Sequence, residues 1–509
     1  MKKTFYWFFL LLIVNSCRAD NQNIKSQNNS SVRQPAFAGQ FYPADSALLL
    51  KQIKVFIENA NPGKIDDAIA IIVPHAGYVY SGQIAADAYS QVKQNKYELI
   101  VVLGTNHTTA GFSGISVYPE GAFATPIGNA KIDNITAEEL LKEDSDVNTD
   151  LTVHAKEHSI EVQIPFIKYL FPAAKILPII VGKPDIEMCS RFGKTLAGIV
   201  KNKKVLIVAS SDLSHYPDFD EAVKTDNRTL KTIASLNSGK IVSEMQNQLE
   251  KGIPQLVTCA CGEAPIVAAI ETSRELGASS ASIISYSNSG YNSIGNIDRV
   301  VGYGAVVISC RKDVQSTGVD SLVVDDSYLL TSSDKKTLLR YARKTLEQYF
   351  STQSFPLPRN INPMLKIKRG CFVTFKKDGE LRGCIGRMTG DVPLCTIVGT
   401  MALQAAFNDN RFTTLKQDEL SGIEIEISVL TPFKPIGNVD NIVLGRDGVI
   451  VKKSGRQAVF LPQVATETGW SKEVFLNQLC FKAGLNPGDW KNAELFTFQA
   501  DVFSEEEFY

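Results

Sequence analysis

Six short apolar runs between residues 68 and 309 constrain the fold of this chain more than any other feature. They are AIAIIVP, YELIVVLG, AKILPIIVG, KVLIVASS, ASIISYS and VGYGAVVIS. Continuous apolar runs of this length are typical of strands that are buried on both faces. Amphipathic stretches such as residues 45–60 lie between them, and Asp45 is placed to cap that helix. The sequence therefore predicts an α/β domain, with a mostly parallel sheet and helices on both faces.

The pattern changes after residue 310. Residues 311–325 are mostly polar and predict a linker. From residue 326 the chain continues with a helical stretch and then a hairpin, in which residues 377–379 (Lys-Asp-Gly) provide the turn. Helices and strands follow without regular alternation. We therefore expect two domains, an α/β domain over 33–310 and an α+β domain over 326–509.

Composition excludes several classes of protein. The chain has 509 residues, of which 44% are hydrophobic and 21% charged, values typical of globular domains and not of collagen or disordered chains. The formal net charge is -1 and no long block of Lys and Arg is present, so we expect no nucleic-acid partner. The chain also lacks a G-x-G-x-x-G turn at a strand-to-helix junction and a GK[ST] loop, so we expect no nucleotide cofactor.

The first residues have the pattern of a targeting segment. Lys2 and Lys3 precede an apolar run over residues 5–14, which is too short to be a stable membrane span. The following Val-Asn-Ser-Cys resembles the lipobox of bacterial lipoproteins, which implies a signal peptide over 1–17 and a lipid on Cys17. An ordinary cleaved signal or an uncleaved anchor is the alternative. Residues 18–32 predict a flexible tether, and we expect an exported, membrane-anchored lipoprotein on the periplasmic or outer face.

The cysteines define no disulfide framework. Nine are present, and if Cys17 carries the lipid, the remaining eight have irregular spacings. We expect most of them to be buried free thiols, with any pairing left open.

All five histidines lie in the first 215 residues, and three of them follow apolar runs. His75, His107 and His215 stand where such a run gives way to Gly, Pro, Ser or Asn. Because the carboxyl ends of parallel strands line the ligand crevice of an open α/β sheet, we expect the three imidazoles to converge on one metal or acid/base site. The alternative is that each is a hydrogen-bonding turn or core residue, which is the more frequent role of a single histidine.

Six motifs in the first domain occur in the order of a known family. They are RQPAFAGQFYPAD (33–45), VPHAGYVYSG (73–82), LGTNHT (103–108), EHSIEVQIPF (157–166), SSDLSHY (210–216) and CGEAP (261–265). Together they resemble the Memo family over nearly the whole domain. RGCFVTF, ELRGCIG, AFNDNRF, EISVLTP and FLPQVATETGW make the second domain similar to the AMMECR family. The pair implies the AmmeMemoRadiSam system, and hence a radical-SAM protein as partner.

The Memo resemblance implies a metal site. The family is similar in fold to class III extradiol dioxygenases, whose iron is held by two histidines and a carboxylate beside an acid/base histidine. By motif position, His75 and His107 match the two ligands, Cys261 stands in place of the carboxylate, and His215 matches the acid/base. Because a thiolate is a soft ligand that favours Cu(I), Zn or ferrous iron, we expect iron(II) or copper, and the change from carboxylate weighs against ring cleavage.

Several neighbours are expected to support these residues. Asp212 is placed to orient the imidazole of His215, and Glu157 with His158 to form the outer shell of the metal site. A helix that begins after Gly262 is expected to lower the thiol pKa of Cys261, whose alternatives are a buried inert thiol or a disulfide. Glu263 is the fallback carboxylate ligand.

In the second domain the resemblance draws attention to five motif residues: Arg382, Cys384, Asn408, Asp409 and Arg411. The arginines suit an anion, and the cysteine suits a nucleophile or ligand. Turn chemistry alone explains the Asn and Asp residues, and we favour that interpretation for them.

Three functions remain open: a metal-dependent redox enzyme, in one version an extradiol-type dioxygenase; a protein that sequesters or delivers metal; and a scaffold that binds a peptide or a partner. The small-molecule or peptide ligand is not indicated by the sequence.

Overall fold

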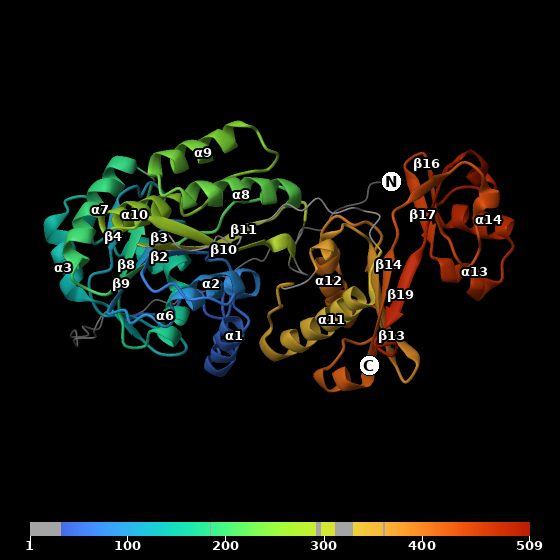
Figure 1. Cartoon of the computed structure of the whole chain (residues 1–509), viewed down its shortest axis with the longest axis horizontal. Helices are drawn as coiled ribbons and strands as arrows, with labels where there is room; N and C mark the ends of the chain where they lie inside the picture. Colours follow the sequence, from blue (N-terminus) through green and yellow to red (C-terminus); the bar gives the residue numbers. More distant parts are fainter. Residues whose placement is uncertain (1–31, 184, 292–296, 311–328, 360–361, 509) are drawn as a thin grey trace, which may run out of the picture.

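The computed structural model describes residues 32–183, 185–291, 297–310, 329–359 and 362–508 (Figure 1). The predicted signal peptide with Cys17, the tether up to residue 31 and the linker over 311–325 lie outside the described residues. Within the described ranges, no helix combines the length and the apolar character needed to cross a bilayer.

The first domain is built on an eight-stranded sheet of order β10-β11-β2-β9-β3-β8-β4-β7. Its four central strands are parallel, as predicted: β2 (Ala68–Val73), β9 (Val205–Ser210), β3 (Leu99–Thr105) and β8 (Lys175–Val181). The edges add antiparallel pairings, which are frequent in otherwise parallel sheets. They involve β10 (Ser280–Asn288) and β11 (Gly302–Ser309) on one side, and β4 (Ile115–Val117) on the other, where β7 (Val147–Asn148) is parallel to β4. A small separate sheet joins β1 (Val32–Arg33), β5 (Ala122–Phe123) and β6 (Ala130–Lys131).

Helices cover both faces of the large sheet (Figure 1). Successive residues of β2 point to opposite sides, so that Ala70 and Ile72 belong to one apolar core and Ile71 and Val73 to the other. The first core is closed by α3 (Asn134–Glu143), α7 (Ile186–Val200), α8 (Phe219–Ala234), α9 (Ser238–Glu250) and α10 (Glu263–Glu275). The second is closed by α1 (Ser46–Glu58), α2 (Tyr78–Val92) and α6 (Ile164–Leu170), with the short α4 (Thr152–Ala155) and α5 (His158–Glu161) beside them. The predicted cap of α1 is present, since the Asp45 carboxylate accepts from Leu48 N at 2.8 Å.

The second domain is α+β, as predicted. After α11 (Ser332–Thr352), strands β12 (Cys371–Lys377) and β13 (Glu380–Arg387) form the expected hairpin, with Asp378 and Gly379 at φ of 53° and 81°. One sheet has the order β13-β12-β14-β19 and the other β15-β18-β16-β17. The remaining elements are α12 (Leu394–Phe407), β14 (Ile423–Leu430), β15 (Lys434–Ile436), β16 (Gly448–Lys453), β17 (Arg456–Phe460), α13 (Pro462–Thr468), α14 (Lys472–Lys482), β18 (Glu494–Phe498) and β19 (Ala500–Ser504). Short 3-10 helices cover Ser289–Tyr291, Pro363–Lys366, Gln417–Gly422, Val439–Asn441 and Asp489–Asn492.

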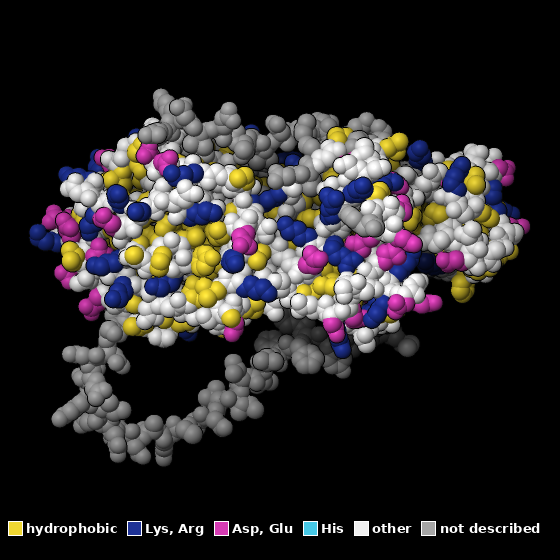
Figure 2. All heavy atoms as spheres, turned by 60° about the horizontal axis from the view of Figure 1, so that its bottom comes forward, with side chains coloured by type: hydrophobic (Ala, Val, Ile, Leu, Met, Phe, Trp, Pro, Cys, Tyr) yellow, Lys and Arg dark blue, Asp and Glu magenta, His cyan; other side chains and the backbone are white. Residues whose placement is uncertain are grey.

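Charges of both signs are interspersed on the face of the molecule in Figure 2. Lys and Arg side chains alternate there with Asp and Glu over both domains.

The two domains are joined by a buried ion pair. Arg359 of the second domain donates to both carboxylate oxygens of Asp87 on α2, at 2.7 and 2.6 Å. The same guanidinium donates to Asn59 O and Asn61 Oδ1. The Asp87 side chain is 0% exposed. An apolar cluster also crosses the boundary, since Phe219 of α8 packs in one core with side chains of α11 and α12.

We expect Arg359→Ala to lower the free energy of unfolding by about 2 kcal/mol, because it leaves a buried carboxylate without its cation. The expected loss is smaller than for a wholly buried ion pair, because 19% of the Arg359 side chain is exposed to solvent that screens its charge. Urea denaturation measures the loss. Lys344→Ala is the control, since its exposed ammonium makes a hydrogen bond to the neutral Asn59 Oδ1 across the same boundary. Equal stability of the two variants would show that the ion pair does not hold the domains together.

Candidate metal centre

The central strands of the large sheet deliver three histidines to one edge. Strands β2, β9 and β3 are parallel neighbours, so their carboxyl ends meet. His75 follows β2, His107 follows β3 and His215 follows β9, each within five residues of the strand end. Cys261 reaches the same place from the loop before α10, because its amide bonds to Asp212 O at 3.3 Å and the next amide bonds to Ser211 Oγ at 2.9 Å.

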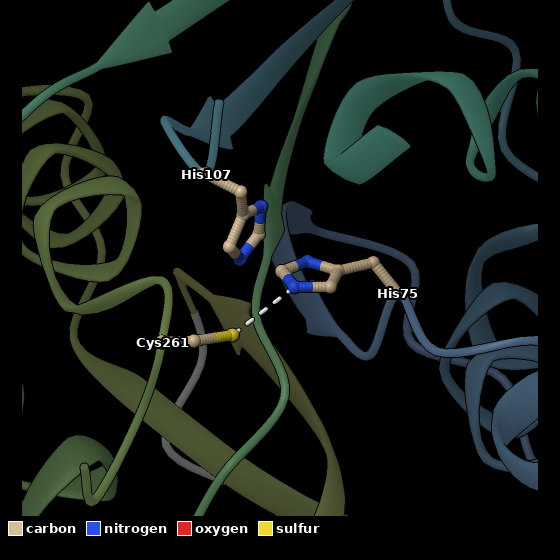
Figure 3. A group of neighbouring side chains, drawn as sticks. All are labelled: His75, His107 and Cys261. Carbon is tan, nitrogen blue, oxygen red and sulfur yellow. Dashed lines mark hydrogen bonds between the residues drawn. The ribbon is translucent and has the colours of Figure 1, made fainter. Parts of the chain in front are cut away.

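The structure brings together His75, His107 and Cys261 (Figure 3). One ligand atom of each lies within 4.8 Å of the others, and His75 Nε2 is 3.0 Å from Cys261 Sγ. Ligand atoms that share one ion at about 2.0–2.3 Å lie roughly 3.3–3.8 Å apart in a tetrahedral site. Side-chain adjustments of less than about 1 Å would therefore suffice for all three to hold one cation.

The hydrogen bonds of Ser210 fix the tautomer of His75. The Ser210 hydroxyl donates its single hydrogen to Ser159 O at 2.6 Å and accepts from Gln163 Nε2 at 2.9 Å. The remaining contact, from His75 Nδ1 at 3.1 Å, must then be donated by the imidazole. Burial, with a smaller contribution from the neighbouring His107, lowers the pKa of His75 to about 3. The ring is therefore neutral at pH 7, and its Nε2 lone pair points at the Cys261 sulfur.

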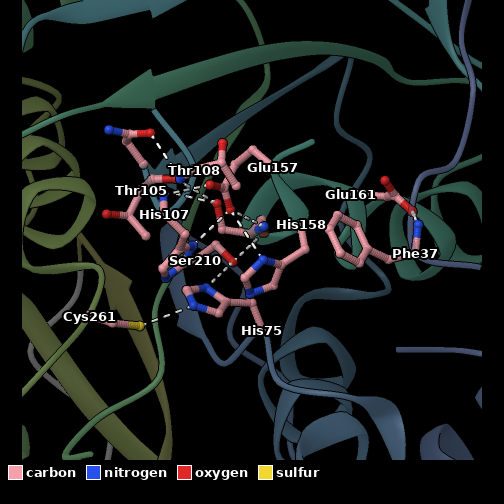
Figure 4. Close-up of polar contacts among 12 residues, drawn as sticks. Phe37, His75, Thr105, His107, Thr108, Glu157, His158, Glu161, Ser210 and Cys261 are labelled. Atoms are coloured by element: carbon pink, nitrogen blue, oxygen red, sulfur yellow. Dashed lines mark hydrogen bonds and ion pairs between the residues drawn. The ribbon is translucent and has the colours of Figure 1, made fainter. Parts of the chain in front are cut away.

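Glu157 sets the orientation of His107 in the same way (Figure 4). Its carboxylate accepts from His107 Nδ1 at 2.9 Å, from His107 N at 2.7 Å and from Ser159 N at 2.8 Å. Burial would raise the pKa of Glu157, but these hydrogen bonds, that from His107 Nδ1 first, outweigh it and lower the pKa to about 2. With Nδ1–H donated to a carboxylate, Nε2 of His107 keeps its lone pair for a metal.

His158 packs against both of these imidazoles. Its ring stacks on His107 with centroids 4.6 Å apart, and it meets His75 edge to face at 5.3 Å. Its Nδ1 lies 3.5 Å from Glu157 Oε1. Burial and the two neighbouring rings lower the pKa of His158 to about 4, so its ring is neutral at pH 7.

Asp212 contacts a different partner from the one expected. Its Oδ1 accepts from the backbone amides of His75 and Ala76, at 2.7 and 3.1 Å. These hydrogen bonds hold the His75 segment and not the imidazole of His215. His215 nevertheless lies at the centre, since Asp212, His215 and Cys261 form another group whose ligand atoms are within 4.8 Å. Burial lowers the pKa of His215, and its buried Nε2 has no hydrogen-bond partner among the described residues.

The thiol of Cys261 does not have the lowered pKa that the sequence suggested. Burial, and then the Asp212 carboxylate, raise its pKa well above the ordinary value. Helix α10 begins only at Glu263, and loss of water around the sulfur outweighs the field of its N-terminus. Binding as a thiolate must therefore release a proton. Cys261 and Cys259 are both free, as are all eight cysteines in the described ranges.

Glu263, the fallback ligand, does not join the groups of neighbouring ligand atoms found among the described residues. Burial raises the pKa of its carboxyl to about 7 at the start of α10. The carboxylates beside the centre are Glu157 and Asp212 instead.

The motif residues of the second domain all have hydrogen-bond partners within that domain. Arg382 pairs with Glu419 through two hydrogen bonds of 3.1 and 3.0 Å. Asp409 accepts from Cys384 N and from the guanidinium of Arg411, which also donates to Cys384 O at 2.9 Å. Asn408 is the C-cap of α12, and its side-chain amide donates to Gln404 Oε1 at 3.0 Å. Both arginines already have carboxylate partners, which agrees with turn and packing roles.

Sequence reasoning missed three supports of the centre. Ser210 and Gln163 fix the tautomer of His75, and Glu161 holds the chain segment that packs on His158. Ser210 and the other two lie inside motifs that were recognised, SSDLSHY and EHSIEVQIPF, yet nothing local in the sequence says which partners they contact.

Comparisons with known proteins match both halves of the chain. A family model described as Memo-like protein matches residues 33–307, and one described as AMMECR1 matches residues 339–503. A MEMO1 family protein of Methanobrevibacter smithii is 35% identical over 287 residues, which cover 54% of this chain and 98% of that protein. One of Aquifex aeolicus is 39% identical over 273 residues, covering 53% and 97%. Among solved structures, an uncharacterised protein from Pyrococcus horikoshii is 36% identical, covers 35% of this chain and 94% of its own, and has a TM-score of 0.32.

Proposed function

The chain belongs to the Memo family, and from that premise and the geometry above we propose that it binds iron(II) or copper through His75, His107 and Cys261. The observation that carries the proposal is the state of the two imidazoles. Each has its Nδ1–H donated to a buried acceptor, so each presents an Nε2 lone pair beside one sulfur. Fixed tautomers of this kind are what outer-shell partners provide in metal sites.

The donor set fits the proposed ions. Two imidazole nitrogens and one thiolate suit Cu(I), Zn and ferrous iron better than they suit hard cations such as Mg or Ca. Three protein ligands leave at least one coordination position for a small molecule, which is the mark of a reactive site. The His107 side chain is 28% exposed, so one side of the centre borders solvent. These features favour a redox-active centre over a closed storage site.

The position of His215 favours a reactive centre over one that only binds metal. It lies beside Cys261 with a buried ring nitrogen that has no partner among the described residues, and its lowered pKa keeps it neutral. A neutral imidazole in that position can accept a proton from a bound phenol or thiol. The ion, when bound, would supply Lewis acidity or one-electron chemistry to such a ligand.

Elemental analysis of protein purified anaerobically, without affinity-tag metals, tests the proposal. We expect about one iron or copper per chain, held at the three side chains. Protein that takes up neither ion, even when purified in their presence, would contradict it.

Oxygen uptake separates the redox enzyme from a protein that only sequesters or delivers metal. Protein loaded with Fe(II) should consume oxygen with catechol-like substrates if it acts as an extradiol-type dioxygenase. His215→Ala should then bind metal like the wild type and lose that consumption. Absence of uptake by the metal-loaded wild type would favour sequestration.

Two further features are proposed from the sequence alone. A lipid on Cys17 would hold this centre at a membrane surface on the outer side of the cell. A radical-SAM protein of the same system is the proposed partner, by family resemblance.

A further inference from the structure

The buried carboxylate of Glu161 binds a segment that is distant in sequence. It is 1% exposed and lies at the end of α5, the helix that begins with His158. Its Oε2 accepts from Arg33 Nη1 at 2.7 Å and from Ala36 N at 2.9 Å. Its Oε1 accepts from Phe37 N and from Tyr42 OH, both at 2.8 Å. All four donors belong to residues 33–42, so one carboxylate fixes this whole segment.

Arg33 strengthens the attachment. Besides Glu161, it donates to His154 O and Glu157 O, both at 2.8 Å. The segment 33–42 is therefore tied to the stretch of chain that carries Glu157 and His158. Its other end contacts the start of α2, since Tyr78 N donates to Phe41 O at 2.7 Å.

The fixed segment places two aromatic rings on His158. The Phe41 ring lies 4.6 Å from the His158 ring, and the Phe37 ring lies 5.5 Å from it in an edge-to-face contact. Figure 4 shows the Phe37 backbone beside Glu161 and its ring directed toward His158.

His158 transmits these contacts to the metal ligands. It stacks on His107 and meets His75 edge to face, and these two rings are 5.1 Å apart at 83°. A ring that is packed on one side by phenylalanines limits the positions that its neighbours on the other side can take.

We propose that Glu161 is a positioning residue of the metal centre: by binding residues 33–42 it holds Phe37 and Phe41 against His158, and His158 against the two ligand imidazoles. The inference rests on the proposed function. It adds a residue that touches neither the metal ligands nor the ion.

A carboxylate is required because four donors need two acceptor oxygens. A glutamine has one oxygen and one amide nitrogen, so two of the donors would face a donor group. Depending on the amide orientation, the exposed pair is Arg33 with Ala36 N, or Phe37 N with Tyr42 OH. Glu161→Gln therefore loosens the segment while conserving the shape of the side chain.

Titration with Co(II), a spectroscopic stand-in for ferrous iron or zinc, tests the inference. The wild type should bind with a thiolate-to-cobalt charge-transfer band from Cys261. Glu161→Gln should bind about tenfold more weakly, the order of loss found for outer-shell partners, with altered ligand-field bands. Glu271→Gln is the matched control, a buried glutamate on α10 that bonds Ser238 and Arg274. It should keep wild-type cobalt affinity and spectrum even if its melting temperature falls.

Unchanged affinity and spectrum in folded Glu161→Gln would overturn the inference. Should that variant not fold, Phe41→Leu decides, because it keeps an apolar side chain but removes the ring on His158. Weaker binding and altered bands support the positioning role, and wild-type behaviour refutes it. Failure of the wild type to give the thiolate band would instead refute the proposed metal site, which keeps the two failures distinct.

Discussion

Replacing His75 by alanine is expected to weaken binding of iron or copper by about a hundredfold or more. Structural sites with four ligands are worth about 10–16 kcal/mol, or roughly 3 kcal/mol per ligand, and each 1.4 kcal/mol is a tenfold change in affinity. Alanine also cannot replace the contacts of the buried ring, so the Nδ1 contact with Ser210 and the Nε2 contact with Cys261 are lost together. Competition with a chelator of known affinity measures the change.

His154→Ala is the control for this experiment. His154 is as buried as His75, and burial lowers its pKa to about 4, but its Nε2 bonds Ser116 Oγ at 3.2 Å, outside the groups of neighbouring ligand atoms. It should lose stability and keep wild-type metal affinity. Equal losses of affinity in the two variants would indicate damage to the fold. Wild-type affinity in His75→Ala would show that the ion binds elsewhere.

The site could be predicted from sequence where position along a strand decides it. His75 and His107 follow apolar runs that form parallel strands on either side of β9, so the pattern that specifies the sheet also specifies the edge at which they meet. The prediction of Cys261 as a ligand depended on the family resemblance. This residue lies in a loop before a helix, and the path of that loop depends on contacts with Ser211 and Asp212.

The supports of the site were not predictable, because they depend on pairs far apart in the chain. Glu161 bonds donors more than 100 positions away, and Asp212 bonds the amide of His75 across two neighbouring strands. Proximity in sequence suggested His215 as the partner of Asp212, but in the fold the Asp212 carboxylate accepts from the backbone amides of His75 and Ala76. Similarly, the helix N-terminus near Cys261 was visible in the sequence, whereas the burial that dominates its pKa was not.

In the second domain, too, local features were predictable and contacts between distant residues were not. The hairpin turn at Asp378 and Gly379 was predicted because its left-handed backbone has a local residue signature. The ion pair between Arg382 and Glu419 was not, since it joins two separate segments. Local residue patterns therefore predict the elements and the hairpin, whereas side-chain pairs between distant segments are seen only in the fold.

Asp226 is a further residue that the sequence did not single out. It lies in α8, is fully buried, and accepts from Ser214 N and Tyr286 OH, both at 2.8 Å. Ser214 precedes His215, so this carboxyl supports the loop that carries the proposed proton acceptor. Burial raises the pKa of Asp226 to about 7, against smaller opposing contributions from its hydrogen bonds.

We expect the free energy of unfolding of Asp226→Asn, taken relative to the wild type, to increase by about 4 kcal/mol as the pH rises from about 4 to about 7. In that window the folded protein keeps the carboxyl protonated, whereas the unfolded chain ionises it near the ordinary value of 3.8. In the wild type, the protonated Asp226 carboxyl therefore makes its full contribution to the free energy of unfolding below pH 3.8. That contribution falls by about 1.4 kcal/mol per pH unit until the carboxyl ionises in the folded protein near pH 7. Asparagine resembles the neutral acid in shape and does not titrate. Urea denaturation of both proteins from pH 4 to 8 measures the difference.

Taking the difference between two proteins is essential here, because other groups titrate in the same window. The buried histidines His75 and His158 favour the unfolded chain as the pH falls, but they are common to both proteins and cancel. Asp220→Asn on the same helix is the control. Its exposed carboxylate pairs with Lys368, so its loss should change stability by less than about 1 kcal/mol at any pH in the range. A stability difference between Asp226→Asn and wild type that stays constant from pH 4 to 8 would mean that Asp226 is ionised in the folded protein. The loop of His215 would then rest on a charged carboxylate rather than a neutral one.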